Sequence, residues 1–148
     1  MIPPLVFLDS SCLVAATLSP SGGSGKIVAL AAQGRLALVV SPLIIAEVVR
    51  TLSEKFGQGE LQRFLANLMI PQLYRTPAPT EEECESWAEV TDIRDCHVLA
   101  AAFNSHCDCL VTLDRKHLLT DVVRARFPYE VMNPAEFLEW FYKQEELP

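Results

Sequence analysis

Apolar residues along this chain fall into short uninterrupted runs that alternate with longer, amphipathic stretches. The apolar runs are typical of strands that are covered on both faces in a parallel sheet. We predict strands at residues 5–8, 36–40, 109–113 and 129–132, with a further short strand at 72–74. The intervening stretches predict helices at residues 12–18, 26–33, 42–56, 60–69, 81–90, 94–105 and 134–143.

Residues with strong backbone preferences mark several of the predicted helix boundaries. Ser41 followed by Pro42 is typical of an N-cap and a first helical residue, and Thr80 with Glu83 forms a capping box. The glycine- and serine-rich segment 19–25 is predicted to be a flexible loop. Strands that alternate with helices across short connections predict an α/β fold, a three-layer α/β/α sandwich with a central, mostly parallel sheet.

Length and composition add to this picture without changing it. A chain of 148 residues suits one compact unit, and we expect residues 1–148 to form a single domain. The five cysteines are an odd number, and we expect them to be reduced and mostly buried. The chain has no apolar run long enough to cross a membrane and its N-terminus lacks signal-peptide features, so we expect a cytoplasmic protein with no membrane partner.

The charge of the chain is strongly acidic, and it restricts the kind of partner. The formal net charge of −7 comes from 12 basic and 19 acidic residues, and 15 of the acidic residues follow residue 75. This balance argues against a protein that coats nucleic acid through a broad basic face. It is compatible with a protein that uses some of its carboxylates to bind metal cations.

Four acidic residues stand where carboxylates are unusual. Asp9 and Asp114 directly follow apolar strands, and ligands of parallel sheets bind beyond the carboxyl ends of the strands. Glu47 and Asp95 lie within strongly apolar helical segments, where a carboxylate is costly to desolvate unless something neutralises it. Divalent cations remove the repulsion between gathered carboxylates, and oxygen ligands suit Mg²⁺ or Mn²⁺. A site of this kind activates water and stabilises the charge that builds on a phosphodiester.

With these residues placed, the chain resembles the PIN-domain ribonucleases, especially the VapC-like toxin components of toxin–antitoxin systems. The resemblance covers nearly the whole chain, and the order and spacing of five short motifs carry it. These motifs are residues 6–11 (VFLDSS), 41–47 (SPLIIAE), 92–102 (DIRDCHVLAAA), 110–119 (LVTLDRKHLL) and 133–138 (NPAEFL). The resemblance implies a PIN-like version of the predicted sandwich.

The resemblance also implies which residues form the site. The acidic metal-binding and catalytic set would be Asp9, Glu47, Asp95 and Asp114, with Mg²⁺ or Mn²⁺ as the cofactor. Ser10 and Thr112 would orient the carboxylates or a metal-bound water by hydrogen bonds. Asp92, one helical turn before the third acid, is either a helix cap or the rim of the site. The sequence departs from the family pattern at Cys96 and His97, where relatives commonly carry acidic or amide residues.

The implied activity is that of an endoribonuclease that cleaves RNA phosphodiester bonds, with Arg115 and Lys116 as possible RNA contacts. The implied partners are an RNA substrate, a cognate antitoxin and a second copy in a homodimer. Two alternatives stay open: a catalytically idle PIN-like interaction or scaffold module, and a DNA-directed nuclease. The segment Gly22–Lys26 is similar to a phosphate-binding P-loop but lacks its first glycine and its final Ser or Thr.

Overall fold

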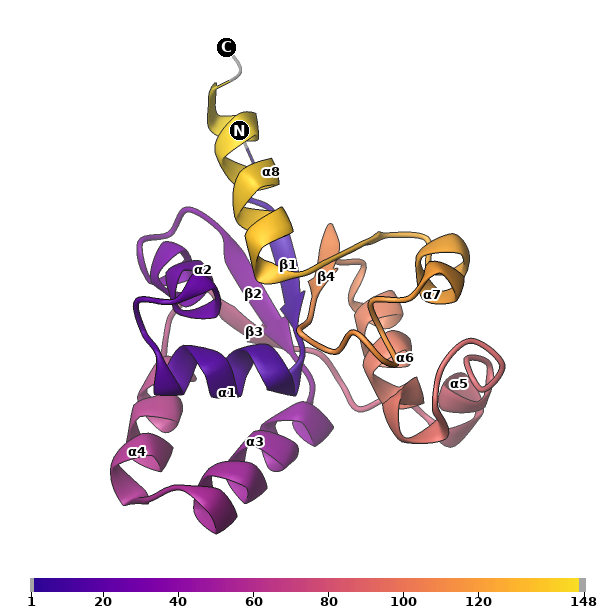
Figure 1. The fold of residues 1–148 in the computed structure, drawn as a ribbon, viewed down its shortest axis with the longest axis horizontal. Coiled ribbons are helices and arrows are strands. Elements are labelled where there is room, and N and C mark those ends of the chain that lie inside the picture. Colours follow the sequence, from indigo (N-terminus) through magenta and orange to yellow (C-terminus); the bar gives the residue numbers. More distant parts are fainter. Residues whose placement is uncertain (1, 147–148) are drawn as a thin grey trace.

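A computed structural model describes residues 2–146 and contains a central sheet of parallel strands (Figure 1). The strands are β1 (Leu5–Leu8), β2 (Ala37–Val40), β3 (Leu73–Arg75), β4 (Cys109–Val111) and β5 (Glu130–Met132). Within the described residues they pair in the order β3-β2-β1-β4-β5, and every neighbouring pair is parallel. The predicted mostly parallel sheet is therefore confirmed.

Helices cover the sheet and complete a three-layer α/β/α sandwich. They are α1 (Ser10–Leu18), α2 (Gly23–Ala32), α3 (Pro42–Lys55), α4 (Gln58–Asn67), α5 (Glu81–Glu85), α6 (Cys96–Ser105), α7 (Asp121–Arg126) and α8 (Pro134–Glu146), with a 3₁₀ turn at Ile93–Asp95. Helix α1 packs on α2, α3 and α4, and α8 packs on α2, whereas α5 packs on α6. Figure 1 shows these two groups of helices apart from each other, with the central strands β1 and β4 between them.

The predicted caps form as hydrogen bonds in the structure. The Ser41 side chain accepts from the Ile44 amide at the start of α3. The Thr80 hydroxyl accepts from the Glu83 amide while the Glu83 carboxylate accepts from the Thr80 amide, which completes the capping box of α5. After α5, however, the chain continues in turns rather than as the predicted helix to residue 90, because its hydrogen bonds there span three residues, as from the Val90 amide to the Trp87 carbonyl.

The segment 19–25, predicted as a flexible loop, is instead partly helical. Helix α2 begins at Gly23, and both Ser24 and Gly25 are buried. Glycine is needed at position 25 because a Cβ there would lie 2.2 Å from the carbonyl oxygen of Pro20. The glycines of this segment therefore permit close packing of the backbone.

Helix α7 was absent from the predicted elements. It is only six residues long and contains two adjacent valines, whose branched side chains favour strands over helices. The Thr120 hydroxyl caps it by accepting from the Val123 amide, and the side chain of Val123 is fully buried. Tertiary packing thus overrides a weak local preference.

The cysteines are free and mostly buried, as the sequence predicts. Within the described residues the cysteines form no disulfide, and four of the five are buried. The residues from 2 to 146 contain no helix that is both long enough and apolar enough to cross a membrane.

Candidate metal centre

The site is built where the two central strands end. Strands β1 and β4 are neighbours, and the next strands in the chain, β2 and β5, lie on opposite sides of this pair. The carboxyl ends of such a pair are the usual ligand-binding position of a parallel sheet. The Asp9 amide donates to the Val111 carbonyl at 3.2 Å and ties the two strand ends together. Asp9 and Asp114, each placed shortly after its strand, therefore face the same region.

Asp9 is the most deeply buried acid of the predicted set, with 4% of its surface exposed. It caps α1, since its Oδ1 accepts from the Ser11 amide at 2.6 Å and from the Ser10 hydroxyl at 3.3 Å. Its Oδ2 accepts a short hydrogen bond from the Thr112 hydroxyl. Burial nevertheless raises the pKa of Asp9 above its ordinary value, because these hydrogen bonds offset only part of the desolvation.

Thr112 joins two of the predicted acids through one hydroxyl group. Its Oγ1 donates to Asp9 and accepts from the Asp114 amide at 3.0 Å. Thr112 is fully buried, so this bridge is shielded from water. Both residues that the sequence analysis assigned to a supporting role, Ser10 and Thr112, thus lie within hydrogen-bond distance of Asp9.

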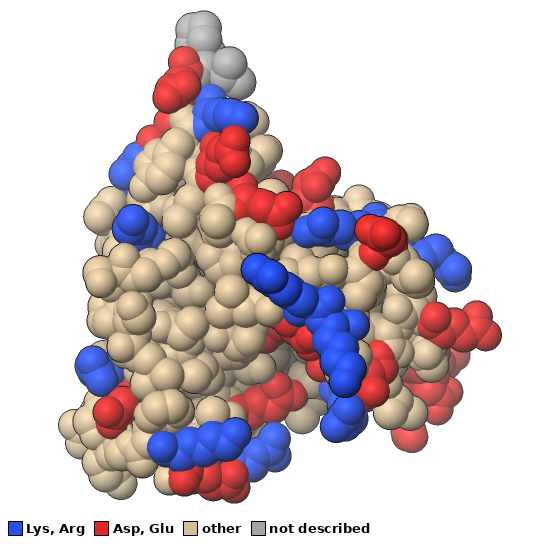
Figure 2. Space-filling view, in the orientation of Figure 1, with Lys and Arg blue, Asp and Glu red and all other residues tan. Residues whose placement is uncertain are grey.

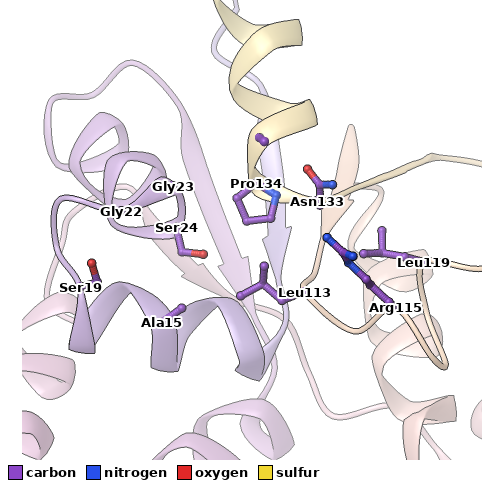
Figure 3. A pocket seen from close by; sticks show the side chains of 11 residues that line it. Ala15, Ser19, Gly22, Gly23, Ser24, Leu113, Arg115, Leu119, Asn133 and Pro134 are labelled. Atoms are coloured by element: carbon purple, nitrogen blue, oxygen red, sulfur yellow. The ribbon is translucent and has the colours of Figure 1, made fainter.

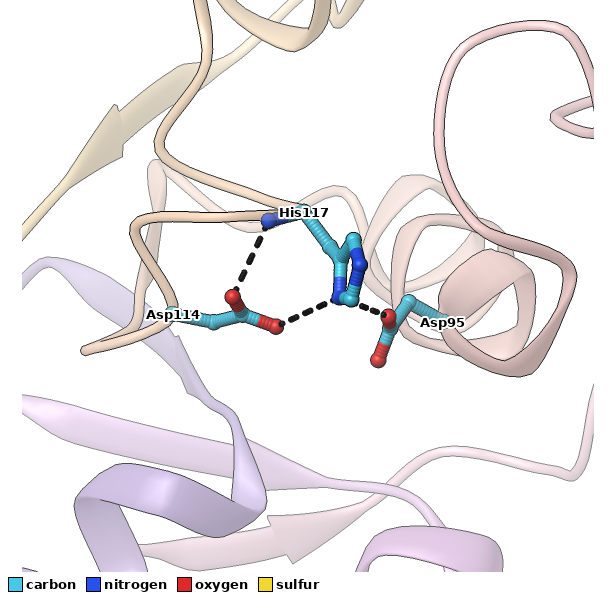
Figure 4. Close-up of side chains that lie close together, drawn as sticks. All are labelled: Asp95, Asp114 and His117. Carbon is cyan, nitrogen blue, oxygen red and sulfur yellow. Dashed lines mark hydrogen bonds and ion pairs between the residues drawn. The ribbon is translucent and has the colours of Figure 1, made fainter.

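Asp95, Asp114 and His117 form the tightest cluster of ligand-type side chains among residues 2–146 (Figure 4). One ligand atom from each lies within 4.8 Å of the others. The His117 Nδ1 atom is 3.1 Å from Asp95 Oδ2 and 3.6 Å from Asp114 Oδ2, so it stands between the two carboxylates. All three side chains are about one quarter exposed, which leaves the cluster open to solvent.

The electrostatics of this cluster favour a cation. Burial raises the pKa of Asp95, and the negative charges of Asp114 and Asp9 raise it further, while His117 lowers it. Neighbouring carboxylates disfavour the charged form of Asp95. A bound cation would remove this repulsion and stabilise the charged form. The donor set of aspartate oxygens with one imidazole fits a divalent metal cation.

Glu47 lies apart from this cluster in the structure. It extends from α3, and its Oε1 is 2.7 Å from Nε2 of His97 on α6. Partial burial raises the pKa of Glu47, but the hydrogen bond and charge of His97 outweigh it, and the pKa is lowered overall. A hydrogen bond from the side chain of Ser10, which also donates to Asp9, lowers the pKa of Glu47 as well.

His97 is one of the two residues at which the sequence departs from the family pattern, and it lies beside Glu47. Its Nε2 atom is committed to Glu47, while its Nδ1 atom is buried with no hydrogen-bond partner among the described residues. The side chain is 12% exposed. His97 therefore holds Glu47 in place from α6.

Asp92 serves both roles that the sequence left open. Its carboxylate caps the 3₁₀ turn by accepting from the Arg94 amide at 2.9 Å, and it lies 4.0 Å from His117 at the rim of the cluster. Hydrogen bonds from Arg94 lower the pKa of Asp92 to about 2. The charge of Asp92 is thus compensated by Arg94, whereas the pKa of Asp95 is raised.

Arg115 and Lys116 lie in the turn that follows Asp114, and both are exposed. The Asp114 Oδ1 atom accepts from the amides of Lys116 and His117, both at 3.0 Å, so the carboxylate itself shapes this turn. Figure 2 shows a band of basic side chains across the middle of this face, with acidic side chains beside it.

His117 is the site residue that the sequence analysis missed. It stands three residues after Asp114, and the turn between them carries its ring back onto the carboxylates. A histidine at this spacing after a strand-end aspartate is the signal that was available. The histidine reaches the carboxylates only because the chain turns between residues 114 and 117, and the Asp114 side chain closes that turn by its hydrogen bonds.

Comparisons with known proteins identify the family and the fold. A sequence model of the PIN domain family matches residues 5–116, which include all four predicted acids. No curated protein matches the chain in sequence.

Several solved structures share the fold. VapBC2 from Rickettsia felis, determined with a DNA fragment from its promoter, has 16% identity and a TM-score of 0.59 over 87% of this chain and 98% of that one. VapC20 from Mycobacterium tuberculosis, a toxin that cleaves the sarcin–ricin loop, has 17% identity and a TM-score of 0.58 over 82% and 95%. PAE2754 from Pyrobaculum aerophilum has 17% identity and a TM-score of 0.63 over 95% and 91%.

Proposed function

Because the chain belongs to the PIN domain family, we propose that it is a divalent-metal-dependent endoribonuclease. The observation that carries the proposal is the meeting of Asp95, Asp114 and His117 near the buried Asp9; the three aspartates lie inside the matched region, and His117 directly follows its last residue. These side chains form an acidic, solvent-accessible site in a chain with a net charge of −7. Such a site requires a cation before it can accept a phosphodiester.

The site residues have different proposed roles, which follow from their contacts. Asp9, Asp95 and Asp114 would hold the metal, with Glu47 bridging to it or positioning a water molecule. A bound Mg²⁺ or Mn²⁺ supplies an activated water and neutralises charge that develops on the phosphate. Ser10 and Thr112 fix the Asp9 carboxylate, and His97 fixes Glu47, so two of the acids are oriented before substrate arrives.

His117 adds a nitrogen at the same point. With its Nδ1 atom between Asp95 and Asp114, it relieves part of their repulsion in the absence of a cation. Its position favours a role either as a further ligand or as a group displaced when the metal binds. Arg115 and Lys116, exposed next to Asp114, would contact the RNA backbone.

We further propose that the protein is the toxin of a toxin–antitoxin pair, with an antitoxin partner and a homodimeric state. The likeness to VapBC2 and to VapC20, which is named as a toxin, supports the toxin assignment. An RNA-cleaving toxin would act in the cytoplasm. We also propose that residues 1–148 form one PIN-like domain, which predicts a single cooperative unfolding transition.

The test is cleavage of a panel of RNAs in Mg²⁺ or Mn²⁺, compared with the same panel in EDTA. Wild type is expected to cut RNA only with metal, and Asp9→Asn and Asp95→Asn are expected to lose the activity. Asp121→Asn, which neutralises an exposed aspartate at the start of α7, serves as the matched control.

Each outcome separates this proposal from its rivals. If Asp9→Asn degrades RNA as well as wild type, the site is wrongly assigned or a contaminant is responsible. A wild type that binds metal but cuts no RNA favours the scaffold alternative. Cleavage of DNA with the same metal and residue dependence, and no cleavage of RNA, favours the DNA-directed nuclease.

A further inference from the structure

His117 places an imidazole nitrogen among carboxylates, at a centre where the other predicted ligands all offer oxygen (Figure 4). We propose that His117 is a direct ligand of the metal, and that its nitrogen makes the centre favour a divalent transition-metal ion, such as Mn²⁺ or Co²⁺, over Mg²⁺. The inference rests on the proposed metal-dependent function, and it adds the residue that would select the ion.

The distances around the His117 ring match those between neighbouring ligands of one ion. The Nδ1 atom is 3.1 Å from Asp95 Oδ2 and 3.6 Å from Asp114 Oδ2. Two ligands at right angles on an octahedral ion, each about 2.1 Å from it, lie about 3 Å apart. The spacing therefore suits one ion that is shared by the nitrogen and by one oxygen of each aspartate.

The backbone of His117 is held on both sides of the ring. Its amide donates to Asp114 Oδ1 at 3.0 Å, and its carbonyl accepts from the Thr91 hydroxyl at 2.6 Å. The next residue, Leu118, is buried in the core. These contacts direct the ring to the carboxylates before any ion arrives, so little order has to be imposed when the metal binds.

The second nitrogen of the ring also has the kind of neighbour that metal-bound histidines have. Its Nε2 atom lies 4.0 Å from Asp92 Oδ2, a separation that a bridging water can span. A carboxylate on this side of an imidazole fixes which nitrogen carries the proton and leaves the other nitrogen free for the metal. Asp92 would then support the ligand without being a ligand itself.

Permanent positive charges near the cluster are directed elsewhere. Arg94 pairs with Asp92 at 3.0 Å. Arg115 extends along the cavity drawn in Figure 3, toward the start of α8. Among residues 2–146, the ion pairs of the two clustered aspartates are those with His117. The carboxylates are therefore left for a cation that the imidazole can share.

The donor set separates metal ions by their ligand preferences. Mg²⁺ takes oxygen ligands in a strict octahedron and keeps several waters, whereas imidazole is a common ligand of transition-metal ions. For a given set of ligands, affinity rises along the first transition row from Mn²⁺ to Co²⁺. An imidazole in place of a further carboxylate therefore provides less charge for Mg²⁺ and a nitrogen for the others. The preference over Mg²⁺ should be larger for Co²⁺ than for Mn²⁺.

The test replaces the nitrogen ligand with an oxygen ligand. In His117→Asn the side-chain Oδ1 atom is attached at the same position along the side chain as Nδ1 of the histidine. The matched control is His106→Asn, which changes an exposed histidine at the opposite end of α6 from Asp95. Asparagine tolerates the left-handed backbone of position 106, where φ is 54°.

Two measurements are made on untagged protein at pH 8. Isothermal titration calorimetry gives the Kd for Mg²⁺, Mn²⁺ and Co²⁺ added as the metal alone. Pulsed EPR of the Mn²⁺-loaded protein detects the magnetic coupling of a nitrogen bonded to the ion. Wild type labelled with ¹⁵N only at histidine shows whether that nitrogen belongs to an imidazole, so the result does not depend on how well the variant folds.

His117→Asn is expected to weaken Co²⁺ binding at least about tenfold and Mn²⁺ binding by less, while Mg²⁺ binding is retained. Wild type and His106→Asn should show the histidine nitrogen coupling, and His117→Asn should lose it.

A wild type that binds Mn²⁺ without a nitrogen coupling would overturn the inference, since His117 would then be a counter-charge that leaves when the ion binds. Equal losses of Co²⁺ and Mg²⁺ affinity in His117→Asn would overturn the selectivity. Nitrogen coupling with the expected change of ion preference, in a protein that cuts no RNA, would support the ligand while the proposed nuclease function fails. Metal-dependent RNA cleavage without nitrogen coupling would support the function and overturn the inference.

Discussion

Replacing Asp95 with asparagine is expected to stabilise the metal-free protein while removing its response to metal. Carboxylate oxygens of Asp95 and Asp114 lie within 4.8 Å of each other, and each side chain is about one quarter exposed. Coulomb's law at this separation gives about 1 kcal/mol of repulsion with the dielectric constant of water and about 3.5 kcal/mol with an effective value near 20. Because His117 already offsets part of the repulsion, we expect a net gain of about 1–2 kcal/mol in the free energy of unfolding.

The gain should depend on pH in a defined direction. Burial and the neighbouring carboxylates raise the pKa of Asp95 in the folded protein above the ordinary 3.8. Below the ordinary pKa the side chain is protonated in both the folded and the unfolded states, so wild type and variant should have equal stability. As the pH rises through the raised pKa, the folded wild type acquires the repulsive charge and the advantage of the variant reaches its full value.

The assay is urea denaturation in EDTA at pH 8 and at a series of lower pH values, repeated with Mn²⁺. Wild type is expected to gain stability with Mn²⁺, and Asp95→Asn is expected to lose most of that gain. The control is Asp92→Asn, one turn earlier, where the pKa is lowered to about 2 by Arg94 and neutralisation should reduce stability. The reasoning is refuted if Asp95→Asn is no more stable than wild type in EDTA at pH 8, or if its advantage grows toward acid pH.

Three further predictions concern the framework of the site. Thr112→Val should lower the free energy of unfolding by about 1–3 kcal/mol, because the buried carboxylate of Asp9 loses its hydroxyl donor. Urea denaturation measures this change, and a variant as stable as wild type would contradict the Thr112 bridge. Gly25→Ala should lower the free energy of unfolding by at least about 2 kcal/mol, because the added Cβ would lie 2.2 Å from a backbone oxygen. Gly59→Ala, which has open space around it, should raise the free energy of unfolding by up to about 1 kcal/mol, and thermal melts compare the two variants. In His97→Ala the pKa of Glu47 should rise toward its ordinary value, as measured by NMR titration. Wild type loses stability as the pH falls below 4.5 through the lowered pKa of Glu47, and this loss should be smaller in the variant.

The sheet was predictable because its strands are buried on both faces and their apolar runs stand out. The same runs located Asp9 and Asp114, since a parallel sheet places the residues after its central strands at one edge. Helix starts with a Ser or Thr cap were equally accessible, as at Ser41 and Thr80. Each of these depends on residues close together in the sequence or on a general rule of topology.

What could not be predicted depends on contacts between distant segments. Helix α2 begins earlier than expected because Gly25 packs against the Pro20 carbonyl, and a glycine-rich sequence by itself also suits a flexible loop. The pairing of His97 with Glu47 joins residues on two helices of different layers. His117 reaches the carboxylates only through a turn whose hydrogen bonds are made by the Asp114 side chain.

That turn has a consequence for how the metal would be held. Asp114 Oδ1 already accepts from two backbone amides at 3.0 Å, whereas its Oδ2 faces His117 and Asp95. The carboxylate is therefore predisposed to give a cation one oxygen rather than two. Single-oxygen ligation leaves coordination positions for water and for substrate oxygens, which small octahedral cations retain readily. In the proposed metal site, the hydrogen bonds of this four-residue turn would leave Oδ2 of Asp114 as the oxygen available to the cation, and coordination positions would remain for water and substrate.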